Sequence, residues 1–318
     1  MRRLLLPLPL LVALGLVAGG WVYPRSGQNY PSQGRAHDYI AAAACGPGKS
    51  VGCFGMANGS TVPFYLYETY GAVPNPHFIS EYTFLLQSDC YFTPRIQEAC
   101  QYLNDQLAWL EANGKSPHKG LSVWPVWNGI ANGMVQGELA EVFVRQFDFT
   151  GNSHWLDLAD RAGRAFDWSA GNGGVAHVYE SGRYWYISSN VGHPDRLYVL
   201  NQMNFALLSL DNLCKRFGGD WCVRLDRGLA TLTRTGRWFV SVDDFAGATY
   251  NGISDWSYHR VAIQTYRASC SYHDLNARTL SELSRARGGI SVFQQFIDRW
   301  RASYNVAVSA GLCPPSTW

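Results

Sequence analysis

The amino-acid sequence predicts a mainly α protein, a barrel or toroid of paired helices (α/α) with long aromatic loops and a small β-hairpin. Two observations favour this fold class. Apolar residues recur at steps of three and four in seven segments of the 318-residue chain, which is the spacing of an amphipathic helix. The connections between these segments alternate between short polar turns and long stretches rich in Gly, Tyr and Trp. Such helices form hairpins with short turns at one end and long loops at the other.

The predicted elements follow from the positions of the apolar stripes. The stripes fall within residues 103–110, 135–143, 155–166, 200–210, 225–232, 280–283 and 292–300. A polar turn at 149–153 joins the second stripe to the third. The long connections are 168–196 and 236–274, and long segments of this kind in a compact domain are usually functional. Within the first of them, Glu-Ser-Gly at 180–182 separates two alternating runs and predicts a β-hairpin over 174–187.

Composition divides the chain into three parts. Residues 1–20 have a cationic head, a short apolar run and small residues at the end, which indicates a signal peptide or an uncleaved membrane anchor. Residues 21–119 are predicted to form a loop-rich N-terminal arm with the first helices. Residues 120–318 are predicted to form the catalytic-like α/α domain.

The balance of charged and aromatic residues favours carbohydrate as a partner. Charged residues make up 16% of the chain, against about 25% in a typical globular protein, whereas aromatic residues reach 14%. Exposed rings suit sugars because the apolar face of a pyranose can lie flat on them. A net charge of +2, without a run of Lys and Arg, argues against nucleic acid. We expect membrane attachment only through an uncleaved N-terminal anchor.

The cysteines indicate an oxidising compartment, so we expect a secreted, periplasmic or secretory-pathway lumenal protein. Three near pairs and the two cysteines left over predict four disulfides: Cys45–Cys53, Cys90–Cys100, Cys214–Cys222 and Cys270–Cys313. Eight cysteines allow about 105 connectivities, so this pairing is one hypothesis among many. The sequence contains no Cys-x-x-Cys pair of the kind that zinc sites use, and we expect neither a metal nor another cofactor.

Two stretches of the sequence carry a family resemblance. The first is Trp127-Asn-Gly-Ile-Ala-Asn-Gly-Met-Val-Gln-Gly-Glu138, and the second comprises Trp256-Ser-Tyr-His-Arg260, Ser271-Tyr-His-Asp-Leu-Asn276 and Phe293-Gln-Gln-Phe-Ile-Asp-Arg-Trp300. Their order and spacing resemble the catalytic domain of the D-glucuronyl C5-epimerases over residues 120–305. The resemblance implies a barrel of paired helices and an enzyme that inverts the acid-bearing carbon of glucuronate in a polysaccharide. The expected partner is therefore a uronic-acid-containing polysaccharide.

Epimerisation at C5 requires two proton-transfer groups on opposite faces of the sugar, together with a group that stabilises the enediolate. The resemblance implies that Tyr272 is an acid/base and that Tyr258 is its partner in a phenolic network. It also implies that Arg260 clamps the substrate carboxylate. His273 is a further catalytic candidate, although a histidine at a helix start is often only a hydrogen-bonding residue.

Five more residues are candidates for substrate binding. Gln136 belongs to the helix that borders the sugar cleft in the family, but a helix amide equally often bonds a neighbouring turn. Trp124 and Trp127 are candidate sugar platforms. Trp185 and Asn190 belong to the long connection expected to contact the sugar. The alternative for each ring is a place in the core.

The second base is left open. The family has an acidic residue after its Trp-Tyr pair, whereas Trp185-Tyr186 is followed here by Ile187, which leaves Glu180, His193 or Asp195 as alternatives. The leading hypothesis is a polysaccharide uronate C5-epimerase. A uronate lyase would use the same proton abstraction and then lose the C4 substituent. A carbohydrate-binding protein that lost the base is the third hypothesis.

Overall fold

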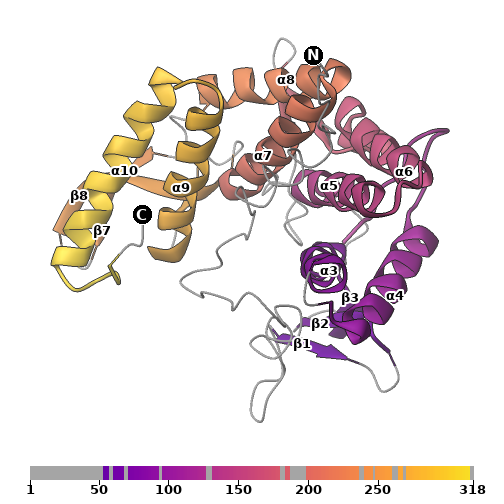
Figure 1. Cartoon of the computed structure of the whole chain (residues 1–318). Helices are drawn as coiled ribbons and strands as arrows, with labels where there is room; N and C mark the ends of the chain where they lie inside the picture. The colour runs from indigo at the N-terminus through magenta and orange to yellow at the C-terminus, as the bar shows by residue number, and fades with distance from the viewer. Residues whose placement is uncertain are drawn as a thin grey trace, which may run out of the picture. The chain divides into compact units, whose positions relative to one another are not determined.

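In the computed structural model, every described residue belongs to one compact unit, Pro31–Trp318. The described residues are 53–56, 60–67, 71–92, 95–126, 131–179, 183–186, 198–235, 240–245, 248–259, 264–267 and 270–315. They contain eight α-helices and three small β-sheets, which confirms a mainly helical fold (Figure 1). None of these helices has both the length and the apolar character of a membrane span. The predicted signal peptide or anchor at 1–20 lies outside the described residues.

The eight helices form four consecutive hairpins, and the two helices of each hairpin pack together. The hairpins are α3 (Pro76–Tyr91) with α4 (Gln97–Asn113), α5 (Gly133–Thr150) with α6 (His154–Gly163), α7 (Leu200–Phe217) with α8 (Gly219–Thr235), and α9 (Cys270–Ala286) with α10 (Ser291–Ser309). Seven of them correspond to the predicted stripes. Helix α3 was not predicted. Its buried apolar residues Ile79, Tyr82, Leu86 and Cys90 recur at steps of three and four, but polar residues such as Ser80 and Gln87 are buried beside them.

The first helices of the four hairpins run parallel to one another. Interactions join positions at similar depths along neighbouring helices: Ser80 with Glu138, Gln87 with Gln146, Asn132 with Gln202, Asp148 with Arg216, Asn204 with Thr279, and Asp211 with Arg287. The N-termini of α3, α5, α7 and α9 therefore lie at the same end of the molecule. We call it the loop end.

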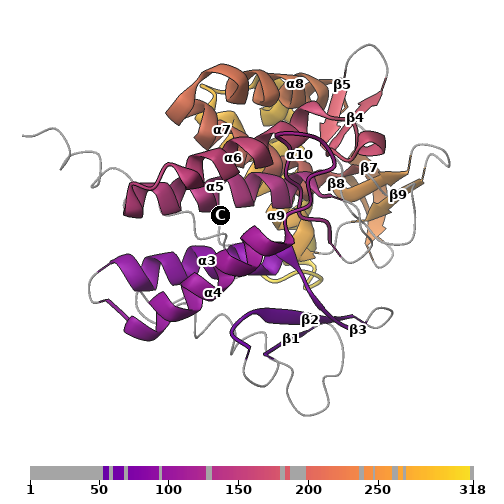
Figure 2. The same ribbon diagram turned by 90° about the vertical axis from the view of Figure 1, so that its right-hand side faces the viewer.

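The β-strands precede these N-termini, and Figure 2 shows them gathered on its right-hand side. The strands are β1 (Cys53–Met56), β2 (Pro63–Tyr67), β3 (Gly71–Pro74), β4 (Ala176–Tyr179), β5 (Arg183–Tyr186), β6 (Tyr198–Val199), β7 (Val240–Phe245), β8 (Ala248–His259) and β9 (Gln264–Arg267). Strands β1–β3 form one antiparallel sheet, β4 and β5 a hairpin, and β8 pairs with β6, β7 and β9.

The structure thus confirms the predicted hairpin and the separation of short turns from long connections. The short turns 151–153 and 287–290 and the single residue Gly218 lie opposite the loop end. The sheets over 53–74 and 198–267 were not predicted. In the second of these sheets, Tyr198 of β6 pairs with Tyr258 of β8, a long-range contact that alternation within one segment does not reveal.

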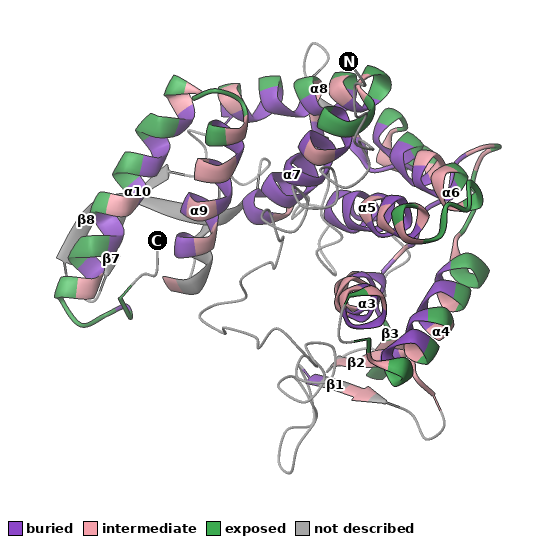
Figure 3. Ribbon diagram, in the orientation of Figure 1, coloured by how far each residue is buried: buried purple, intermediate pink, exposed green. Residues whose placement is uncertain are grey.

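Helices α5 and α7 form the centre of the core, and Figure 3 shows both as largely buried. Glycines permit their close packing. A Cβ on Gly137 of α5 would lie 2.8 Å from Cβ of Ser209 on α7. A Cβ on Gly133, the first residue of α5, would lie 2.8 Å from Cβ of Tyr186 on β5. The hairpin β4–β5 is therefore held directly against the N-terminus of α5.

Three of the predicted disulfides are confirmed, and each braces one helical hairpin. Cys90–Cys100 joins α3 to α4, Cys214–Cys222 joins α7 to α8, and Cys270–Cys313 joins the start of α9 to the segment after α10. Cys53 is also disulfide-bonded. Its predicted partner Cys45 lies outside the described residues.

Candidate functional site

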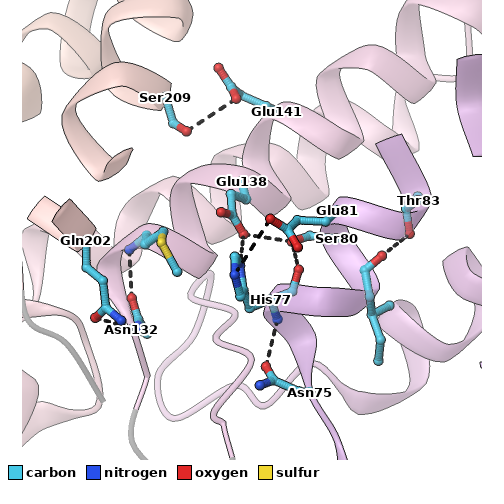
Figure 4. Close-up of polar contacts among 12 residues, drawn as sticks. Asn75, His77, Ser80, Glu81, Thr83, Asn132, Glu138, Glu141, Gln202 and Ser209 are labelled. Carbon is cyan, nitrogen blue, oxygen red and sulfur yellow. Dashed lines mark hydrogen bonds and ion pairs between the residues drawn. The ribbon is translucent and has the colours of Figure 1, made fainter. Parts of the chain in front are cut away.

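A polar cluster lies between the first turns of α3 and the N-terminal half of α5, at the loop end (Figure 4). Its centre is the buried carboxylate of Glu138, which lies 2.9 Å from Nδ1 of His77 and 2.8 Å from Oγ of Ser80. The side chain of Glu138 is 1% exposed, whereas that of His77 is 19% exposed. The imidazole therefore connects a buried carboxylate to the solvent-accessible part of the loop end.

Local sequence explains why His77 stands there. Asn75 is the N-cap of α3, and its Oδ1 accepts a hydrogen bond from the backbone N–H of His77 at 3.0 Å. Pro76 occupies the first turn, where its fixed φ suits a helix start. These two residues fix the beginning of α3, so the His77 side chain emerges in its first turn beside α5.

The protonation of Glu138 depends on burial and on its neighbours in the cluster. Burial raises the pKa of the Glu138 carboxyl above its usual range, and the nearby Glu81 adds to this effect, while contacts with His77 and Ser80 oppose it. Oγ of Ser80 also lies 2.7 Å from the carbonyl oxygen of His77, which can only accept a hydrogen bond. A hydroxyl carries one hydrogen, so Ser80 donates to only one of these two oxygens at a time.

Amides from α5 and α7 continue the polar surface at the loop end. Asn132, the N-cap of α5, accepts a hydrogen bond from the backbone N–H of Met134, and its Nδ2 donates to Oε1 of Gln202 at 3.2 Å. Beside it, Oδ1 of Asn201 is buried and has no hydrogen-bond partner. A buried carbonyl oxygen in this state is commonly satisfied by an ordered water.

The backbone brings two of the predicted catalytic residues to this end. Tyr258 of β8 pairs with Tyr198 of β6 on one side and with Thr265 of β9 on the other. Strand β6 leads directly into α7, and β9 precedes α9. Tyr272 is the third residue of α9. Tyr258 and Tyr272 thus stand at the N-termini of neighbouring parallel helices.

His273 lies in the interior between α9 and α10. It is 1% exposed, its ring is nearly parallel to that of Tyr304 at 5.7 Å, and its Nε2 donates to the carbonyl oxygen of Trp300 at 2.8 Å. Burial lowers the pKa of His273 to about 4. These contacts are those of a neutral histidine that fixes α9 against α10, and no contact with a substrate is possible without opening that interface.

Three other candidates are buried, which corrects their expected roles as direct sugar contacts. Trp124 is 1% exposed, and its Nε1 donates to the carbonyl oxygen of Leu110 at 2.7 Å. Trp185 is fully buried. The Gln136 amide donates to Ser122 O at 3.2 Å and accepts from Trp124 N at 3.0 Å, so it bonds a neighbouring segment. Gln136 faces inward from α5 and Trp185 from β5, and Trp124 packs inward from the segment before α5.

The remaining candidates lie outside the described residues. They are Trp127, Asn190 and Arg260, together with the alternative bases Glu180, His193 and Asp195. Among the residues that are described, no three His, Cys, Asp or Glu side chains form a group that would hold a metal ion.

Sequence reasoning missed His77 and did not assign a role to Glu138. Two signals were present. Asn75-Pro76 is a typical helix start, which places His77 in a first turn. Glu138 stands three residues after Val135 and four before Val142, so a carboxylate interrupts an apolar stripe of α5. A charged residue at such a position is buried only with partners.

Comparison with known proteins agrees with the helical architecture. The sequence profile of the family described as the D-glucuronyl C5-epimerase C-terminus matches residues 115–302. A glycoside hydrolase family 76 α-mannanase from Bacteroides thetaiotaomicron superposes with a TM-score of 0.50 at 11% identity, over 84% of this chain and 68% of that one. Because identity is low, this likeness concerns the fold alone.

Two further solved structures superpose less closely. A D-mannose isomerase gives a TM-score of 0.45 at 15% identity, over 72% of this chain and 59% of its own. A sugar epimerase from a ruminal bacterium gives a TM-score of 0.46 at 12% identity, over 83% of this chain and 66% of its own. The chain thus spans 59% of the length of the D-mannose isomerase. No curated protein sequence matches the chain.

Proposed function

The chain belongs to the family described as the D-glucuronyl C5-epimerase C-terminus, and on that premise we propose that it is a polysaccharide uronate C5-epimerase. The match covers residues 115–302, which include Tyr258 and Tyr272. The observation that carries the proposal is the backbone position of these two tyrosines at the N-termini of α7 and α9. Two tyrosines whose backbones lie at one end of the molecule could supply the two proton-transfer groups that a reaction on both faces of a sugar requires.

In the proposed reaction, a base at the loop end removes the C5 proton of a glucuronyl residue. The electron pair passes into the carboxylate and forms an enediolate, and an acid returns a proton to the opposite face. Tyr272 is proposed as one proton-transfer group, with Tyr258 beside it and Arg260 as the carboxylate clamp. The partial positive charges at the N-termini of four parallel helices favour an anionic substrate at the same end.

Further features of the proposal concern architecture and location. We propose that the four helical hairpins are part of an α/α barrel or toroid whose loop end holds the polysaccharide. The disulfides are compatible with an exported protein in an oxidising compartment, so a secreted, periplasmic or lumenal location is part of the proposal.

The test is deuterium incorporation at C5 of uronate polysaccharides incubated with the protein in heavy water. We expect exchange at C5 without a new ultraviolet chromophore. Tyr272→Phe should lower this exchange by about 100- to 10,000-fold with little loss of polysaccharide binding, because the ring remains and only the acidic hydroxyl is lost. Tyr102→Phe, on the outer helix α4, is the matched control and should exchange normally.

Other outcomes identify the alternatives. A chromophore from an unsaturated uronate product indicates a lyase, in which the same carbanion expels the C4 substituent. Binding of the polysaccharide without exchange or cleavage indicates a carbohydrate-binding protein. Near-normal exchange in Tyr272→Phe would remove Tyr272 from the mechanism.

A further inference from the structure

The His77–Glu138 pair joins two parts of the chain that differ in their family relationship. Glu138 lies within residues 115–302, which match the family, whereas His77 lies before them on α3. The segment preceding the family domain therefore contributes a titratable side chain to the loop end. It does so through a contact of 2.9 Å between Nδ1 of His77 and Oε2 of Glu138.

The geometry of this pair is that of an oriented acid/base. One imidazole nitrogen faces a buried carboxylate, which holds the ring in place and stabilises the imidazolium when the ring takes up a proton. Glu138 is itself fixed by Ser80 at 2.8 Å. Nε2 of His77 lies 3.8 Å from Oε1 of Glu81, farther than a hydrogen bond, so a second carboxylate lies near the ring.

A purely structural His–Glu pair is also present in the chain and differs in its surroundings. His154 of α6 bonds Glu111 of α4, and both side chains are more than 40% exposed. That pair lies at the first residue of α6, opposite the loop end. In the His77 pair the carboxylate is buried and only the imidazole reaches the surface. Burying a carboxylate costs free energy, and a surface bridge between helices does not require it.

We propose that His77 is the second proton-transfer group of the site and that Glu138 is the positioning residue that orients it. The proposal rests on the proposed uronate chemistry and supplies the base for which the sequence leaves no carboxylate after Tyr186. In the forward direction the C5–H bond breaks and an N–H bond forms at Nε2 of His77, while the electron pair enters the substrate carboxylate. The phenol of Tyr272 then protonates C5 on the opposite face. The imidazolium and the phenolate return to their starting states by proton exchange with water.

The test compares three variants of the full chain in the heavy-water exchange assay. His77→Gln should lower C5 exchange by about 100-fold or more while KM changes by less than about threefold, because general acid–base groups act mainly in the transition state. Glu138→Gln keeps the contact with Ser80 but removes the charge, and it should lower exchange by about 10-fold or more. His154→Gln, the matched control, should exchange like the wild type. Circular dichroism verifies that each variant is folded.

A second measurement does not depend on turnover or on the stability of a variant. The ring resonances of His77 in the histidine-labelled wild type should shift when a glucuronate oligosaccharide is added, and a neutral glucan of equal length should leave them unchanged. Those of His154 should not move with either sugar.

The outcomes separate this inference from the proposed function. Wild-type exchange together with normal exchange in a folded His77→Gln protein overturns the role of His77 and leaves the epimerase proposal in place. A His77 resonance that saturating glucuronate oligosaccharide does not move also overturns it. If the wild type incorporates no deuterium, the proposed function fails and the proton-transfer role of His77 fails with it. A shift of the His77 resonance would then still place the sugar beside this residue.

Discussion

The burial of His273 makes a quantitative prediction about acid stability. Burial lowers the pKa of His273 from 6.5 to about 4, and its Nε2 donates to Trp300 O at 2.8 Å. Because the folded-state pKa lies below the unfolded-state value, the unfolded chain takes up the proton first as the pH falls. The stabilisation is complete above about pH 6.5 and is lost as the pH falls to about 4. At about 1.36 kcal/mol for each pH unit, the difference corresponds to about 3 kcal/mol.

The assay is urea unfolding, with the disulfides intact, of the wild type and of His273→Gln between about pH 7 and about pH 4. Glutamine can still donate to the Trp300 carbonyl but does not titrate. The free energy of unfolding of the wild type, minus that of the variant, should therefore fall by about 3 kcal/mol over this range. Subtraction removes the contributions of the other titrating groups, which both proteins share.

Asn204→Ala is the control, because it removes the bond between Asn204 and Thr279 across α7 and α9 without removing a titrating group. The loss in unfolding free energy caused by Asn204→Ala should be the same at every pH. A wild-type advantage over His273→Gln that stays constant from about pH 7 to about pH 4 would refute the reasoning. It would mean that His273 is accessible enough to be protonated in the folded protein, and His273 would regain its standing as a catalytic candidate.

Three more predictions concern stability, each measured by urea unfolding. Gly228→Ala should destabilise the protein by about 1–2 kcal/mol, because a Cβ there would clash with a Leu207 methyl group and this overpacking outweighs the gain in helix propensity. Ala230→Gly, at an exposed position of the same helix, measures propensity alone. A larger loss of stability in Ala230→Gly than in Gly228→Ala would contradict the packing argument. Burial raises the pKa of Glu141 to about 7, so the folded state retains a proton that the unfolded state releases. Glu141→Gln should therefore become increasingly stabilising, relative to the wild type, as the pH rises from about 4.5 to about 7. A difference in unfolding free energy that does not change with pH would contradict this prediction. Replacing Cys270 and Cys313 by serine opens a loop with a sequence separation of 43 and should lower the free energy of unfolding by about 4 kcal/mol. A loss below about 1 kcal/mol would show that the disulfide does not restrict the unfolded chain.

Seven helices were predicted from their apolar stripes, and α3 was not. The stripe of α7 contains Leu200, Met203, Leu207 and Leu210, all of them buried, so its period can be recognised in the sequence. Helix α3 buries Ser80 and Gln87 in addition to its apolar residues, because Glu138 and Gln146 on α5 bond them. A polar residue becomes a core residue only when its partner is present, and that partner lies about 60 positions away in the sequence. No local pattern contains this information.

The candidate site likewise contains features that the sequence indicated and features that only the structure shows. The family resemblance singled out Tyr258 and Tyr272, and the backbone brings them to the loop end. It also suggested Trp124, Trp185 and Gln136 as sugar contacts. The sequence does not show whether a tryptophan or glutamine faces the solvent or the core. Only the tertiary structure shows that these three side chains are buried.

By itself, the sequence determined three of the helical hairpins, the β4–β5 hairpin and the pairs Cys90–Cys100 and Cys214–Cys222, because each depends on residues close together along the chain. Only the tertiary structure decided that α3, α5, α7 and α9 run parallel and that His77 meets Glu138. Those relationships depend on which helix faces share polar partners and on where glycines such as Gly133 and Gly137 allow elements to approach. Burial and partner choice are properties of the packed chain. They turn a histidine from before the family domain and a carboxylate within it into one candidate acid/base pair.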